Sequence, residues 1–234
     1  MKGKSAQKVI ALLPMKGHSE RVPNKNMRLF GGRPLFHSVA ETLEACDCIE
    51  TIVINTDSQI IADDACKHFS KVQIVDRPQN LQGDFVPMND IIGYDLEMTA
   101  GEHYLQTHST NPLLTSATVE AAVEQYFRSL VDHDSLFTVT RIQTRLYWES
   151  GEPVNHNPEE LLRTQDLPPV FEENSNLFLF SKKSFAAVGN KRIGLKPIMF
   201  PMDKLEAVDI DEEVDFRLAE MLYRMQVEEV HHAV

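Results

Sequence analysis

Short apolar runs that end at breakers alternate with segments of helical periodicity along most of the chain. The run at residues 8–14 (KVIALLP) ends in proline, and residues 34–45 then carry apolar side chains at helical spacing. The next apolar run, residues 51–55 (TIVIN), is rich in β-branched side chains, as strands are. Strand–helix–strand successions pair their strands in parallel through right-handed crossovers. We therefore predict an α/β fold with a doubly wound, mostly parallel sheet.

The same reasoning extends to the rest of the chain. Expected strands lie at residues 8–14, 51–55, 72–75, 104–107, 135–140, 176–180 and 196–201. Expected helices lie at residues 34–45, 58–68, 88–99, 116–130 and 212–226. Between about residues 141 and 170 the periodicity fades and several prolines occur, which is typical of an inserted hairpin or lid. We predict a single domain over residues 1–234 with this one excursion.

Composition and charge argue against several classes of function. The net charge of −12 opposes non-specific binding to nucleic acid. No apolar run approaches the roughly 18 residues that span a bilayer, and residues 1–8 are basic and polar, unlike a signal peptide. We therefore expect a cytoplasmic protein with neither nucleic-acid nor membrane partners. Three cysteines, an odd number without a CxxC pair, argue against a disulfide framework and against a zinc site.

Residues 16–33 (KGHSERVPNKNMRLFGGR) form a cationic cluster on an acidic chain. Its cations are Lys16, Arg21, Lys25, Arg28 and Arg33, against a single acid, Glu20. The cluster directly follows the first expected strand, and doubly wound sheets bind ligands beyond the carboxyl ends of their strands. A polar, glycine-containing loop with several cations suits a triphosphate, whose transfer is catalysed mainly by positioning and charge neutralisation. The alternative is a solvated basic loop, since neither the P-loop nor the GxGxxG spacing occurs.

Asp209 and Asp211 are separated by one residue, so on an extended segment both carboxylates point to the same face. Two hard oxygen ligands suit Mg2+, which keeps its remaining positions for water and phosphate oxygens. We therefore predict Mg2+ as the cofactor, with these two aspartates as its ligands. The alternative for Asp211 is that it caps the following helix. For Asp57 capping is the favoured interpretation, and Ser116 is the expected cap of the helix at residues 116–130.

Several segments resemble the CMP-sugar synthetases, which are the acylneuraminate cytidylyltransferases and their relatives for other acidic sugars. Residues 13–26 (LPMKGHSERVPNKN), followed by GGRPL, look like the family's signature loop, IPARGGSKRIPNKN followed by GGKPL. Residues 207–220 (AVDIDEEVDFRLAE) are similar to its SIDIDTELDLQQAE. Further similar segments are NTD at 55–57, Arg77-Pro78 with Leu81 and Asp84, HSTNPLLT at 108–115 and NSNLFL at 174–179.

The resemblance implies a glycosyltransferase-A-like nucleotidyltransferase that transfers CMP from CTP to the anomeric hydroxyl of an acidic 2-keto sugar, such as sialic acid, and releases pyrophosphate. It implies that Lys25 neutralises the α-phosphate, with Asp209 and Asp211 completing the catalytic set. The implied nucleotide-binding residues are Lys16, Ser19, Arg21, Asn26, Arg77 and Asp84. The implied substrate-binding residues are His108, Thr110, Asn111, Asn174 and Phe178. The resemblance also implies a homodimer in which the excursion crosses to the partner.

The sugar end departs from the family pattern more than the phosphate end does. Lys16 replaces an arginine, His108 a glutamine, Leu114 an arginine and Phe178 a tyrosine. Because pockets that select by hydrogen bonds discriminate strongly, such changes can redirect the choice of sugar. The candidate cations for the sugar carboxylate are Arg141, Arg145 and Arg163. The alternative functions are a nucleotidyltransferase for another sugar or a sugar phosphate, and a non-catalytic nucleotide-binding module.

Overall fold

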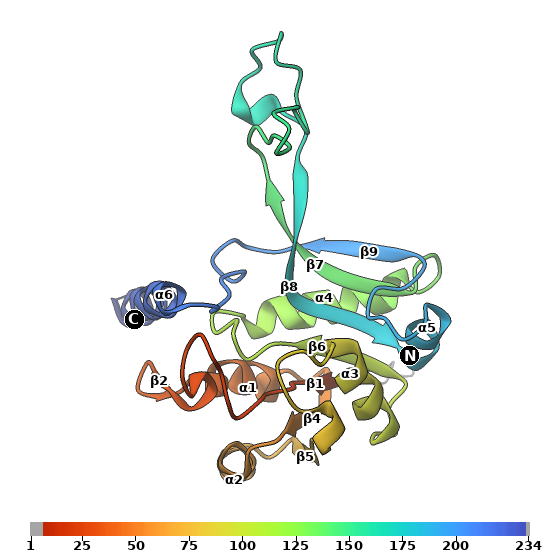
Figure 1. The fold of residues 1–234 in the computed structure, drawn as a ribbon, viewed down its shortest axis with the longest axis vertical. Helices are drawn as coiled ribbons and strands as arrows, with labels where there is room; N and C mark the ends of the chain where they lie inside the picture. Colours follow the sequence, from red (N-terminus) through yellow and green to blue (C-terminus); the bar gives the residue numbers. More distant parts are fainter. Residues whose placement is uncertain (1–6, 233–234) are drawn as a thin grey trace, which may run out of the picture.

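The centre of the fold is a seven-stranded sheet with the strand order β5-β4-β1-β6-β8-β7-β9 (Figure 1). The structure, a computed structural model, describes residues 7–232. The strands are β1 (Val9–Leu12), β4 (Ile49–Thr56), β5 (Val72–Asp76), β6 (His103–Thr107), β7 (Ser135–Ile142), β8 (Val170–Ser181) and β9 (Pro197–Pro201). β8 runs antiparallel to β6 and β7, whereas the other neighbouring pairs in this sheet are parallel. The predicted, mostly parallel sheet is confirmed.

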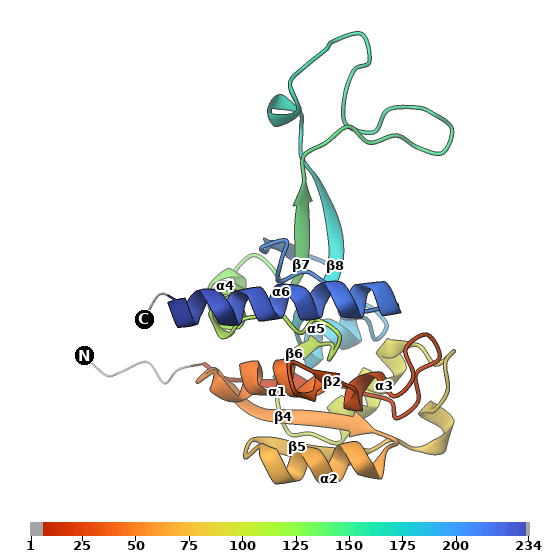
Figure 2. The ribbon, with the colours of Figure 1, turned by 90° about the vertical axis from the view of Figure 1, so that its left-hand side faces the viewer.

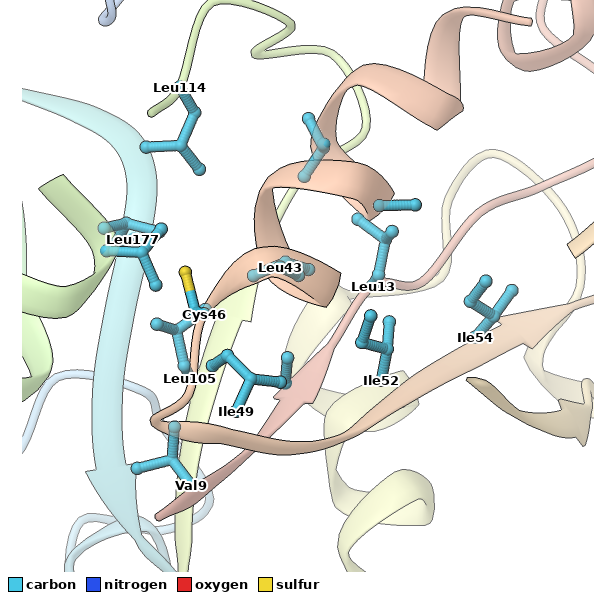
Figure 3. Packing of buried hydrophobic residues seen from close by; sticks show 14 of the residues in the cluster. Val9, Leu13, Leu43, Cys46, Ile49, Ile52, Ile54, Leu105, Leu114 and Leu177 are labelled. Atoms are coloured by element: carbon cyan, nitrogen blue, oxygen red, sulfur yellow. The ribbon is translucent and has the colours of Figure 1, made fainter. Parts of the chain in front are cut away.

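Helices cover both faces of this sheet. They are α1 (Leu35–Ala45), α2 (Gln59–His68), α3 (Met88–Glu97), α4 (Ser116–Ser129), α5 (Lys182–Ala187) and α6 (Glu213–His232), with the 3-10 turns η1 (Lys25–Met27), η2 (Gln79–Leu81) and η3 (Thr164–Asp166). Alternate side chains of a strand point to opposite faces, so Ala11 of β1 packs with α1, α2 and α4 while Leu12 packs with α3 and α5. Figure 3 shows the first of these clusters, with Leu43 of α1 over Ile49 and Ile52 of β4. The doubly wound arrangement is confirmed. Within residues 7–232, none of the helices combines the length and apolar character needed to cross a membrane.

The expected excursion is a hairpin arm that carries β7 and β8 away from the sheet (Figures 1 and 2). The two strands stay paired as far as Ile142 and Val170, and the segment between them is mostly irregular. Large apolar side chains on the arm, Tyr147, Trp148 and Leu161 among them, are exposed to solvent. The fading periodicity at residues 141–170 therefore reflects a projecting arm rather than a lid lying on the sheet.

The end of the cationic loop is held by the C-terminal helix α6 (Figure 2). The loop forms a small hairpin of β2 (Leu29–Phe30) and β3 (Arg33–Pro34). Phe30 packs edge-on against Phe216 of α6, with ring centroids 5.8 Å apart. Arg28 makes a two-pronged ion pair with Glu213 of α6, and Arg33 pairs with Glu41 of α1. These two cations therefore stabilise the fold and do not belong to the phosphate cradle.

Two expected helix caps differ in the structure. The cap of α4 is Thr115, whose hydroxyl accepts a hydrogen bond from the backbone of Thr118, rather than Ser116. The cap of α2 is Ser58 rather than Asp57. At the start of α6 the amides of residues 211 and 212 donate to the carboxylate of Asp215, while the carboxylate of Asp211 accepts a hydrogen bond from Arg21. For α2 and α4 the capping side chain therefore belongs to the direct sequence neighbour of the expected residue.

Candidate active site

A cavity of about 460 Å³ lies beyond the carboxyl ends of β1, β5 and β6. This is the edge of the sheet where doubly wound folds bind their ligands. Nine of the site residues predicted from the sequence line the cavity: Lys16, Ser19, Arg21, Lys25, Asn26, Arg77, Asp84, His108 and Thr110. The structure thus brings all six implied nucleotide-binding residues, Lys25 and two of the implied substrate-binding residues to one site.

Contacts within the loop and with two other segments fix the cationic loop over the cavity. The amide of Gly17 donates to Asp57 Oδ1 at 2.6 Å, and a β-carbon at Gly17 would lie only 2.8 Å from Ser58 Cβ. Asn26 Nδ2 donates to the carbonyl oxygen of the cavity residue Lys16 at 3.0 Å, and Ser109 Oγ donates to Asn26 Oδ1 at 2.7 Å. The side chain of Asn26 therefore joins the loop to the end of β6, and Asp57 anchors its start.

Lys25 lies directly beside the two aspartates. Its Nζ donates to the carbonyl oxygen of Ile210, between Asp209 and Asp211, at 2.5 Å. Arg21 Nη2 donates to Asp211 Oδ1 at 2.8 Å. These contacts join the first segment after β1 to the last segment before α6, which lie 185 residues apart in the sequence.

The charged groups of Lys25, Asp209 and Asp211 lie close together and are partly shielded from water. Burial lowers the pKa of the Lys25 ammonium, while Asp211 and Asp209 act in the opposite direction. The side chain of Asp209 reaches solvent, yet the protein atoms around it desolvate the carboxylate and raise its pKa. Repulsion from Asp211 adds to this increase, whereas a hydrogen bond from Thr110 and the charge of Lys25 oppose it. A further cation would therefore stabilise the two carboxylates.

A buried polar network supports the cavity from behind. Arg77 donates to the side chain of Asn55 through Nε at 2.7 Å and to its carbonyl oxygen at 2.8 Å. Asn55 Nδ2 in turn donates to Asp95 Oδ1 at 2.5 Å. Asp95 is fully buried, and this burial raises its pKa to about 7. At the mouth of the cavity, Lys16 and Asp84 form a partly exposed ion pair.

Replacement of Asp95 by asparagine should reduce the pH dependence of stability. A carboxyl group with a raised pKa in the folded state stabilises the fold at low pH, and this contribution is lost as the pH rises towards about 7. The asparagine variant has no such contribution to lose. The difference between its free energy of unfolding and that of the wild type should therefore shift in favour of the variant by at least about 1 kcal/mol between about pH 5 and pH 8. Urea denaturation at the two pH values measures this. Glu97→Gln, an exposed site on the same helix, is the control and should show no such change.

The remaining substrate-binding candidates do not line the cavity, and neither do Asp209 and Asp211, which lie beside it through Lys25 and Arg21. Asn111 donates to the carbonyl oxygen of Val208 at 3.4 Å, and Asn174 donates to Thr140 Oγ1 at 3.1 Å. Phe178 is buried in the core on the α3 side of the sheet. The candidate cations for the sugar carboxylate make local contacts within the arm, Arg141 with Gln143, Arg145 with Leu162 and Arg163 with Asp166.

Three residues at the site are not among those predicted from the sequence. Phe85 lines the cavity with its side chain 99% exposed, as an aromatic group directly after Asp84. Its position in a polar, glycine-containing turn is a pattern that could have drawn attention to it. Gln106 and Arg192 contact His108 and Phe178 behind the cavity. Arg192 comes from the connection between α5 and β9, where no sequence pattern indicates proximity to β6.

Another group of potential metal ligands among the described residues joins two helices outside the cavity. It consists of His37 on α1 with Asp64 and His68 on α2. His37 Nε2 contacts the Asp64 carboxylate, and His68 Nδ1 donates to the carbonyl oxygen of Asp64 at 2.8 Å. These contacts pair His37 Nε2 and His68 Nδ1 with Asp64, so we interpret the group as a link between α1 and α2.

Comparison with known proteins agrees with this geometry. Residues 10–230 match the family model described as cytidylyltransferase. A CMP-N,N'-diacetyllegionaminic acid synthase of Legionella pneumophila is 26% identical, over 94% of this chain and 98% of the relative. A pseudaminic acid cytidylyltransferase of Campylobacter jejuni is 24% identical over the same shares of the two chains.

The fold has close counterparts among solved structures. That of a CMP:2-keto-3-deoxy-manno-octonic acid synthetase complexed with CTP superimposes with a TM-score of 0.67 at 10% identity, covering 94% of this chain and 100% of the other. At that identity the likeness shows a shared fold. The match to the family model spans nearly the whole sequence, including both the cationic loop and the aspartate pair. The chain therefore belongs to the cytidylyltransferase family.

Proposed function

We propose that this cytidylyltransferase transfers CMP from CTP to the anomeric hydroxyl of an acidic 2-keto sugar and releases pyrophosphate. The observation that carries the proposal is the hydrogen bond from Lys25 to the carbonyl oxygen of Ile210, because it joins a cation that lines the cavity to the backbone between the two aspartates. The names of the two relatives, for legionaminic and pseudaminic acid derivatives, support an acidic sugar.

The reaction forms a bond between the sugar oxygen and the α-phosphorus and breaks the bond from that phosphorus to the bridging oxygen. The hydroxyl proton is released and pyrophosphate leaves. Lys25 stabilises the negative charge on the α-phosphoryl oxygens, and Lys16 and Arg21 stabilise the leaving pyrophosphate. Lys16 is paired with Asp84 and Arg21 with Asp211. Nucleotide binding therefore exchanges ion pairs within the protein for contacts with phosphate.

We propose further that Asp209 and Asp211 bind Mg2+. The donor set fits this ion, since both groups are hard oxygen ligands and their mutual repulsion favours a cation between them. When bound, Mg2+ would neutralise charge on the polyphosphate. Before nucleotide binds, Arg21 pairs with the carboxylate of Asp211, and Lys25 fixes the intervening backbone at Ile210.

Phe85 is expected to stack on the base of CTP. Aromatic stacking on a nucleobase contributes about 1–3 kcal/mol, so Phe85→Ala should raise the KM for CTP about tenfold. The kcat should change little, because stacking on the base stabilises the bound substrate and the transition state equally. Initial rates over a range of CTP concentrations measure both constants. Val131→Ala, which truncates another exposed apolar side chain elsewhere, should leave them unchanged. An unaltered KM for CTP in Phe85→Ala would remove Phe85 from nucleotide recognition.

A pyrophosphate-release assay tests the proposed reaction. CTP, UTP, ATP and GTP are each combined with Mg2+ and a panel of 2-keto sugar acids and sugar 1-phosphates. We expect release only from CTP, and only with a sugar acid. Release with a sugar phosphate would instead support a different nucleotidyltransferase. CTP binding without turnover of any acceptor would support a nucleotide-binding module.

We also propose that the chain forms a homodimer through the arm. Exposed large apolar groups on a projecting element, here Tyr147, Trp148 and Leu161, are typical of a contact surface. Sedimentation velocity should give the mass of a dimer, and the double replacement of Trp148 and Leu161 by glutamate should give a monomer. A monomeric wild type at micromolar concentration would contradict this. The cytoplasmic location stays a prediction.

A further inference from the structure

Arg192 lies behind the cavity, in contact with Phe178, which departs from the family pattern, and with Gln106, which contacts a second departure, His108. Its guanidinium lies over the ring of Phe178, 4.0 Å from the ring centroid. Its Nη1 donates to Gln106 Oε1 at 2.6 Å. Gln106 belongs to β6, is fully buried, and lies two residues before His108, which lines the cavity.

These contacts fix the orientation of the Gln106 amide. An arginine has only donors, so the group facing Arg192 must be the amide oxygen and Nε2 must face the other way. This nitrogen donates to the carbonyl oxygen of Thr107 at 2.7 Å and lies 3.2 Å from His108 Nε2. An amide nitrogen cannot accept a hydrogen bond. His108 Nε2 must therefore be the acceptor, without a proton, and the proton of the neutral ring lies on Nδ1.

The surrounding charges favour the same neutral ring. Burial lowers the pKa of His108 to about 4, and the positive charges of Arg192 and Lys25 add to this effect. Asp211 acts in the opposite direction. At neutral pH His108 therefore carries one ring proton rather than two.

We propose that Arg192 and Gln106 are positioning residues that hold His108 as a neutral Nδ1–H donor for an oxygen acceptor of the sugar acid. The inference rests on the proposed function and deepens it by naming what the protein offers at the sugar end. His108 is half-buried and lines the cavity, so a ligand that covers its donor without offering an acceptor leaves that donor unpaired, and the site selects for a ligand that carries the matching acceptor. The alternative is that Arg192 only packs the core against Phe178, and that the state of His108 does not depend on it.

Two readouts separate these alternatives. Long-range 1H–15N correlation spectra of protein labelled at histidine report the tautomer, with His108 assigned by the loss of its signals in His108→Asn. The wild type should show a protonated Nδ1. In Gln106→Glu the new carboxylate can only accept, so His108 should carry its proton on Nε2, and the KM for the sugar acid should rise about tenfold or more at constant KM for CTP.

A second variant covers the case in which Gln106→Glu does not fold. Arg192→Met keeps an apolar group against Phe178 but frees the Gln106 amide, and should give a mixture of tautomers with the same selective rise in KM. Lys191→Ala, an exposed neighbour, is the control and should match wild type. A protonated Nε2 in the wild type, or a tautomer unchanged in a folded variant, would overturn the proposal. If the tautomer behaves as expected but no sugar acid reacts, the fault lies with the proposed function instead.

Discussion

Replacement of Lys25 by alanine is expected to lower kcat/KM by about 1000-fold or more. Removing one preorganised positive group from the reacting phosphoryl costs roughly 10²- to 10³-fold or more, which at 1000-fold corresponds to about 4 kcal/mol of transition-state stabilisation. No other described cation donates to the backbone between the two aspartates, so Arg21 and Lys16 cannot take its place without moving. Steady-state kinetics with CTP and the acceptor found in the pyrophosphate assay measure the loss.

Folding of this variant should be nearly intact. Lys25 is half-buried and makes one described hydrogen bond, to Ile210, so its loss should cost about 1 kcal/mol in urea denaturation. Lys67→Ala, on the exposed side of α2, is the matched control and should retain full activity. Lys25→Arg keeps the charge with a different geometry, and its kcat/KM should lie between those of Lys25→Ala and the wild type. Wild-type turnover in Lys25→Ala would place Lys25 outside the mechanism.

The order of strands and helices could be predicted because it depends on local pattern. The runs at residues 8–14 and 51–55 differ so clearly from the helical spacing at residues 34–45 that sequence alone separates β1, β4 and α1. The place and direction of β8 could not be predicted. They follow from the arm, which returns the chain beside β7 and inserts β8 between β7 and β6.

The candidate site could be predicted where its chemistry is carried by short motifs. The loop with Lys25 and the pair Asp209 and Asp211 each have a pattern, and the structure places them together. The partners of Arg28 could not be found, because Glu213 is 185 residues away and makes this cation structural. The role of Arg192 cannot be predicted from the sequence for the same reason, since its contact with Gln106 joins segments 86 residues apart. Sequence pattern identifies which charges are present, whereas tertiary contacts decide which of them are available to a ligand.

Replacement of Asp209 by asparagine is expected to abolish the saturable dependence of activity on Mg2+ and to lower kcat at least about 100-fold. The variant keeps the shape of the side chain but replaces a charged ligand by a neutral one. The remaining carboxylate, Asp211, carries a single negative charge and cannot by itself offset the charge of a divalent cation. Titration of activity with Mg2+ measures the effect, and binding of Mn2+ followed by electron paramagnetic resonance reports the site without turnover.

The controls for this experiment separate metal binding from support of the loop. Glu212→Gln removes an exposed carboxylate next to the pair and should titrate with Mg2+ like the wild type. If Asp209 only positions Lys25 through its charge, Asp209→Asn would lose activity yet keep the wild-type Mn2+ affinity and the wild-type Mg2+ midpoint. That result would make the pair structural. A loss of Mn2+ binding together with the loss of rate, in a variant of unchanged thermal stability, would assign the ion to these carboxylates, because the neutral amide preserves the packing and removes only the charge.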